Sequence, residues 1–191
     1  MPSNSLIRWN GERADALNEI ENAHVMVGGT ERGRRYATQQ INYAYAAMLS
    51  AQFQGFCRDL HSECIDQVIS IAPIQLAGIL SKEFAWNRSL DRGNAHPGAI
   101  GSDFDRLGID LWAEVYALDG RNQRRQRLLQ ELNDWRNAIA HQDFDPVAPT
   151  GAPTLHLPRV RTWRRALGGL VRHFDQVMYN YLHGLLSRPP W

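Results

Sequence analysis

Apolar residues recur every three or four positions through most of this 191-residue chain. That spacing places them on one face of an α-helix. The longest such segment runs from about residue 31 to residue 71 and stops before Pro73. Further segments of the same period cover about 12–25, 73–87, 102–118, 121–141 and 160–186. Because no segment makes a convincing strand, the pattern predicts an all-α fold, a bundle of five to six helices with a long second helix.

Glycines and prolines mark the connections between these helices. Two glycines end the first helix, so that residues 12–30 are predicted to form an N-terminal helix and turn. Residues 88–101 contain three glycines and a proline, and residues 142–159 contain four prolines and a glycine. Both stretches are predicted to be long loops, and Ser102 is predicted to cap the helix after the first of them. The whole chain suits a single domain at this length.

The composition is that of an ordinary globular protein, with 43% hydrophobic and 21% charged residues and a formal net charge of +1. A net charge so close to zero excludes binding of nucleic acid through overall positive charge. Any attraction for phosphate must therefore come from local clusters of arginine, which lie at 32–35, 121–127 and 159–165. In the second cluster, Arg121, Arg124 and Arg125 are candidate RNA contacts.

The targeting signals of membrane and secreted proteins are not evident in this sequence. No apolar run approaches the roughly 20 residues of a membrane span, and the N-terminal sequence has no apolar core of a signal peptide. We therefore expect a cytoplasmic protein.

Two cysteines and a histidine share one face of the long predicted helix. Cys57, His61 and Cys64 are spaced by four and three residues. A metal site would need a fourth ligand, and cysteines seven residues apart on a straight helix are about 10 Å apart, too far for a disulfide. The three side chains are predicted to pack in the core, and we expect no metal and no cofactor.

The segment Arg136-Asn137-Ala138-Ile139-Ala140-His141 closes the basic helix over 121–141. It joins a permanent cation, an amide and an imidazole, and we take Arg136, Asn137 and His141 as the candidate catalytic residues. Five residues of an ideal helix turn through about 140°, so Arg136 and His141 would not share a face. We expect the helix to end between Ala140 and Gln142, where a loosened last turn would bring His141 back toward Arg136.

This RNAIAH segment resembles the motif of the HEPN superfamily (higher eukaryotes and prokaryotes nucleotide-binding domains). These are small all-α domains, and their ribonuclease members carry an arginine, a polar residue and, after three to five intervening residues, a histidine. The string NYAYAAMLSAQFQGFCRDL over residues 42–60 is similar to the early long helix of prokaryotic stand-alone HEPN proteins, although its aromatic stripe also suits core packing. Arg92 and His96 superficially echo an Arg to His spacing inside a Gly/Pro loop, and we interpret that echo as accidental.

The resemblance implies a metal-independent endoribonuclease of the toxin–antitoxin or phage-defence kind. It implies that His141 moves the proton of the 2′-hydroxyl, that Arg136 stabilises the transition state and that Asn137 orients the site or contacts phosphate. The products would be a 2′,3′-cyclic phosphate and a 5′-hydroxyl. It also implies a homodimer in which two motifs meet across a two-fold axis, and a possible cognate antitoxin protein.

Three alternatives remain open from the sequence. The domain could be a HEPN dimer that binds a nucleotide or RNA without cutting it, or a helical module for protein interaction. The third alternative concerns the motif itself, which could merely cap its helix and pair with Asp143 or Asp145 of its own loop.

Overall fold

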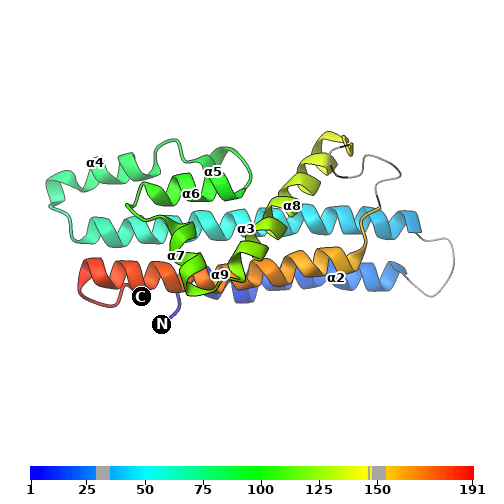
Figure 1. The fold of residues 1–191 in the computed structure, drawn as a ribbon, viewed down its shortest axis with the longest axis horizontal. Coiled ribbons are helices and arrows are strands. Elements are labelled where there is room, and N and C mark those ends of the chain that lie inside the picture. Colours follow the sequence, from blue (N-terminus) through cyan, green and yellow to red (C-terminus); the bar gives the residue numbers. More distant parts are fainter. Residues whose placement is uncertain (29–34, 146, 148–153) are drawn as a thin grey trace.

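The computed structural model describes residues 1–28, 35–145, 147 and 154–191. Helices make up 81% of these residues, and no strand occurs among them. The predicted all-α fold is confirmed. Figure 1 shows α3 (Arg35–Ser70) and α9 (Leu157–Leu186) as two long helices that run side by side. The shorter helices pack around this pair.

The remaining elements follow in chain order. The first half of the chain contains α1 (Asn4–Arg8), the π-helical turn η1 (Trp9–Arg13), α2 (Ala14–Gly28) and, after α3, α4 (Ile74–Ala85). The second half contains α5 (Ser89–Arg92), α6 (Pro97–Asp105), α7 (Leu111–Leu118) and α8 (Asn122–His141) before α9. The turn predicted at residues 29–30 and most of the loop 142–159 lie outside the described residues.

The long helix α3 forms the centre of the core. It contacts α1, α2, α4, α5, α6, α8 and α9. Its apolar stripe is fully buried at Tyr45, Leu49, Phe53, Phe56 and Leu60. The prediction of a long helix with this buried face is therefore confirmed. Within the described residues, α3 is the second extended helical segment, since α1, η1 and α2 form one continuous run before it.

The first helix begins at Asn4 rather than at about residue 12, because carboxylates satisfy its free N-terminal amides. The Ser3 amide donates to Asp175 Oδ1 of α9 over 3.1 Å. The amides of Asn4 and Ser5 donate to Glu63 of α3 over 2.9 and 2.7 Å. The start of the chain is thereby joined to both long helices.

The predicted loop over 88–101 is wrong in its first and last parts. All of α5 and the start of α6 fall within it. Pro97 occupies the first turn of α6, where a missing N–H costs nothing, and the His96 side chain accepts a hydrogen bond from the Ala99 amide over 3.2 Å. Ser102 lies inside α6 and is not its cap.

The single helix predicted over 102–118 is two helices in the structure. Gly108 adopts a positive φ of 84°, a conformation that favours glycine, and Asp110 caps α7 by accepting from the Ala113 amide over 3.0 Å. The hydroxyl of Tyr181 on α9 donates to the Leu107 carbonyl over 2.6 Å. The break lets α7 turn and pack against α9.

Cys57, His61 and Cys64 are all completely buried, as predicted for packing residues. His61 Nε2 lies 2.8 Å from the carbonyl oxygen of Asp103. Burial lowers the pKa of His61 to about 4; the hydrogen bond to the Asp103 carbonyl opposes this shift, and the nearby Arg88 guanidinium contributes to it. Among the described residues, no three side chains of the metal-binding types gather as a metal site would require.

A polar group that we call the His61 network connects α3 to α5 and α6. Its members are His61, Arg88, Asp91 and Asp103. Arg88 pairs with Asp91 over 2.9 Å, and one of its amino groups lies 3.4 Å from His61 Nδ1. The Asp103 carboxylate accepts from the first two amides of α5, over 2.9 and 2.8 Å. These contacts hold the segment for which the sequence predicts a loop.

Within the part of the chain that the structure describes, no helix combines the length and the apolar character needed to cross a bilayer.

Candidate functional site

The helix α8 packs one face on the core and exposes the opposite face. Leu129 and Leu132 are buried, and Trp135 packs against Trp163 of α9 with ring centroids 6.4 Å apart. Asp134, Asn137 and His141, spaced by three and four residues, are exposed. This spacing places the amide and the imidazole of the motif on one solvent-facing stripe.

The helix ends within the predicted window, immediately after His141. Gln142 takes the left-handed conformation with a φ of 55°. Its own amide and the Asp143 amide both donate to the Ala138 carbonyl, and the Gln142 side chain donates to the Ile139 carbonyl over 2.7 Å. The orphan carbonyls of the last turn are thus satisfied by a reversal of the chain directly behind His141.

A pocket of about 470 Å³ lies over this helix end. Its lining consists of Asp134, Asn137, Ala138, His141 and Asp143. His141 makes no hydrogen bond or ion pair with any residue that the structure describes. The structure therefore brings Asn137 and His141 together on one pocket and leaves the imidazole free to meet a ligand.

Arg136 does not line this pocket. The expected movement of His141 toward Arg136 is not seen, because α8 stays helical through His141 and the chain reverses only at Gln142. Arg136 instead reaches the site through Asn137, whose Oδ1 accepts from the guanidinium over 3.3 Å. In one copy of the chain, the cation and the imidazole therefore flank the amide from different sides.

Asn94, which lies between α5 and α6, is a further contributor that the sequence pattern did not predict. Its Nδ2 donates to Asn137 Oδ1 over 2.6 Å. The same turn is fastened to α8 where Asn133 Nδ2 donates to the Ala95 carbonyl over 3.3 Å. Asn94 thus fixes the orientation of the Asn137 amide. The only sequence feature near Asn94 that drew attention was the pair Arg92 and His96 on either side of it. His96 itself is not part of the site, because its Nδ1 accepts a hydrogen bond that caps α6.

Aromatic side chains hold the segment that follows His141. The Phe144 ring stacks on Tyr43 of α3 with a centroid distance of 5.5 Å and lies 6.4 Å from the Trp135 ring. Because Phe144 is only three residues beyond His141, this packing fixes the path of the chain behind the imidazole.

The carboxylates around the pocket do not form hydrogen bonds or ion pairs with His141. Asp134 accepts from Gln130 over 2.8 Å, and Asp143 accepts from the Asp145 amide over 3.3 Å. The alternative in which the histidine pairs with Asp143 or Asp145 as part of a cap is therefore not observed. Two carboxylates beside the imidazole do repel an approaching phosphate, so its binding would require compensating positive charge.

The three arginine clusters differ in how much of their charge is neutralised. Much of the first, including Arg32 and Arg34, lies outside the described residues. In the second cluster Asp119 pairs with both Arg121 and Arg125, over 3.0 and 3.1 Å. The third cluster pairs mainly with acids of other helices: Arg159 with Glu131, and Arg161 and Arg164 with Glu21.

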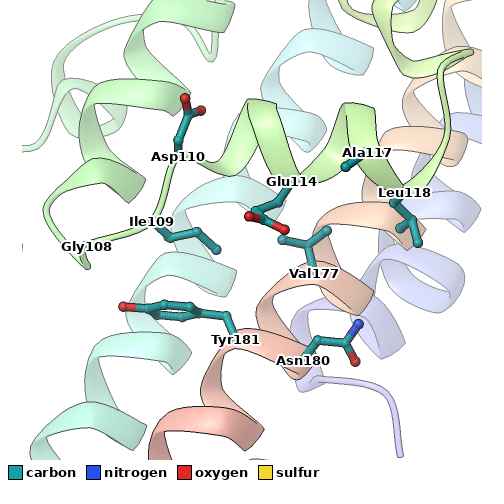
Figure 2. A pocket seen from close by; sticks show the side chains of 9 residues that line it. All are labelled: Gly108, Ile109, Asp110, Glu114, Ala117, Leu118, Val177, Asn180 and Tyr181. Atoms are coloured by element: carbon teal, nitrogen blue, oxygen red, sulfur yellow. The ribbon is translucent and has the colours of Figure 1, made fainter.

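A second pocket, of about 520 Å³, lies between α7 and α9 and contains none of the motif residues. Figure 2 shows Glu114 and Val177 turned toward one another across it, with the Tyr181 ring below the link from Gly108 to Asp110. Two of its polar groups already have structural partners, because Asp110 caps α7 and the Tyr181 hydroxyl donates to Leu107. We therefore place the candidate site at the end of α8.

The comparisons with known proteins add nothing to this geometry: no family model, no curated protein and no solved structure matches the chain.

Proposed function

We propose that this protein is a metal-independent endoribonuclease that cuts RNA through attack of a 2′-hydroxyl on the adjacent phosphate. The observation that carries the proposal is the free imidazole of His141 in one pocket with Asn137, at the helix end where Arg136 also contacts that amide. The RNAIAH sequence and its resemblance to HEPN ribonucleases supply the reaction class.

The reaction needs a group that accepts the 2′-hydroxyl proton. His141 takes that proton while the 2′-oxygen bonds to phosphorus and the bond from phosphorus to the 5′-oxygen breaks. Imidazole is the side chain most often used to take up and release a proton near neutral pH. The products are a 2′,3′-cyclic phosphate and a 5′-hydroxyl.

Arg136 and Asn137 act on the charge that develops at the phosphate. The guanidinium stabilises the phosphorane-like transition state, because a preorganised positive charge lowers its free energy most when it lies beside the phosphate oxygens on which negative charge develops. Asn137 accepts from both Asn94 and Arg136, so its Nδ2 remains to donate to a phosphate oxygen.

A homodimer completes the proposed site. The departing 5′-oxygen requires a proton, and one pocket contains one histidine. A two-fold axis at the end of α8 would bring a second His141 to act as acid and a second Arg136 to offset the carboxylates of the pocket. The proposed setting, a cytoplasmic toxin or defence protein with a possible antitoxin partner, rests on the resemblance alone.

The test is cleavage of labelled RNA by purified protein in EDTA. His141→Ala and Arg136→Ala should each lower the cleavage rate by roughly 10² to 10⁴ while the circular dichroism spectrum and the melting temperature stay unchanged. Asn137→Ala should have a milder effect, because an amide carries neither charge nor a labile proton. His156→Ala, which removes an exposed histidine with no capping hydrogen bond at the start of α9, is the matched control and should cut normally.

Cleavage that survives in His141→Ala, or that occurs only with added Mg²⁺, would overturn the assignment. RNA binding without any cleavage would favour the non-catalytic binding dimer. Sedimentation that shows a monomer at micromolar concentration would count against the shared site.

A further inference from the structure

Four arginines line a hollow of about 440 Å³ between α8 and α9, well away from the His141 pocket. They are Arg121, Arg124, Arg125 and Arg165, and the remaining lining consists of Leu128, Thr162 and Ala166. No acidic side chain belongs to the lining. A hollow with this charge is unusual on a chain whose net charge is only +1.

The pairing of these arginines shows which of them can bind a ligand. Asp119 engages Arg121 and Arg125. Arg124 makes no hydrogen bond or ion pair with any described residue, and Arg165 makes a single 3.4 Å contact to the Thr162 hydroxyl. Two exposed guanidinium groups from different helices therefore face the same hollow without an acidic partner.

The positive surface continues across α9. Arg165 also lines the adjoining hollow of about 510 Å³, together with Arg164 and Arg172. Arg164 is engaged by Glu21 and Asn18, whereas Arg172 is exposed. Arg124, Arg165 and Arg172 thus form a track of free cations over neighbouring hollows, the arrangement that follows a chain of phosphates rather than a single anion.

We propose that this track binds the phosphate backbone of single-stranded RNA, with Arg124 and Arg165 as its main contacts. The inference rests on the proposed function for the identity of the ligand. The carboxylates of Asp134 and Asp143 repel phosphate at the His141 pocket. The arginine track would supply the electrostatic attraction for RNA that this pocket lacks.

The two sites are separated by a fixed length of α8. Seventeen residues from Arg124 to His141 correspond to about 26 Å of helix. That distance is about eight nucleotides at roughly 3.4 Å per nucleotide of a stacked strand. A stacked strand much shorter than this cannot occupy the track and the pocket of one chain together.

The first experiment measures binding of a labelled single strand of about 20 nucleotides at several salt concentrations, in EDTA and in the His141→Ala background to prevent cutting. Adding Arg124→Ala and Arg165→Ala should weaken binding about tenfold and lower the slope of log affinity against log salt by about 1.4, at ~0.7 for each phosphate that is no longer neutralised. Arg58→Ala, which removes an exposed arginine of α3 outside both hollows, should change neither quantity. An unchanged slope in the double variant, or an equal loss in Arg58→Ala, overturns the inference.

The second experiment measures cleavage with His141 intact. The double variant should raise KM for the long RNA and leave kcat unchanged, and it should leave KM unchanged for a dinucleotide, whose single phosphate occupies the cleavage site and cannot also reach the track. An equal rise in KM for both lengths would contradict the inference.

The two proposals fail separately. If no variant cuts RNA while the salt slope still responds to the double variant, the catalytic function fails and the track stands. If cutting depends on His141 while the slope does not respond, the track fails and the function stands.

Discussion

His61 and His141 both lie on long helices, and their surroundings differ in every physical respect. His61 is completely buried, one ring nitrogen lies 2.8 Å from a carbonyl oxygen, and the other faces the Arg88 guanidinium. His141 is exposed at a helix end, and its ring has no hydrogen-bond partner among the described residues. The first imidazole connects helices, whereas the second is free to exchange a proton with a ligand. Residue type alone could not separate these roles.

The largest expected effect that sharpens this comparison is the pH dependence of stability. Because burial lowers the pKa of His61 to about 4, the unfolded chain takes up a proton below about pH 6.5 while the folded chain does not. Stability should therefore be complete above pH 6.5 and fall as the pH drops toward 4, by about 3 kcal/mol from this residue.

Urea unfolding between pH 4 and pH 7.5 would measure this effect. His61→Gln removes the titration and should flatten the curve by that amount relative to the parent protein. An equal slope for His61→Gln and the parent would mean that His61 is not the buried neutral group described above.

The next effect concerns the support of the candidate site. Phe144 is partly buried, so Phe144→Ala should cost about 1–2 kcal/mol, less than the roughly 3–5 of a fully buried phenylalanine. Loss of its stacking on Tyr43 should also displace His141 and lower the cleavage rate up to about a hundredfold. Phe144→Leu keeps much of the packing and is the control. Parallel measurements of melting temperature and RNA cleavage would check both effects. Full activity in Phe144→Ala would mean that the aromatic packing does not position His141.

The smallest effect concerns the residue that ends α8. The positive φ of Gln142 is strained for a residue with a side chain, and the hydrogen bond from that side chain to the Ile139 carbonyl offsets part of the strain. Gln142→Ala keeps the strain and loses the bond, whereas Gln142→Gly loses both, so the glycine variant should be the more stable of the two by about 1 kcal/mol. Denaturant unfolding of the pair measures the difference. A more stable alanine variant would mean that the left-handed geometry is not retained.

The sequence predicted the structure correctly where that structure depends on residues that are near each other along the chain. The apolar stripe from Tyr45 to Leu60 predicted the buried face of α3, and the proline-rich sequence after His141 predicted the end of α8. The fragment 88–118, predicted as a loop followed by one helix, was harder because Pro97 begins a helix there and Gly108 separates two helices. The bond from Asn94 to Asn137 spans 43 residues, and no periodicity encodes a contact of that separation.

The hydrogen bond from Ser3 to Asp175 has a consequence for how the protein is made, because it joins positions 172 residues apart. At about 5–20 residues per second, the ribosome needs roughly ten to thirty seconds to make the acceptor after the donor. Throughout that interval α1 lacks part of its cap, and the side of α3 that packs against Phe174 is uncovered. In a nascent chain that stalls before α9, His141 is already present, but the core that holds α8 in place is incomplete.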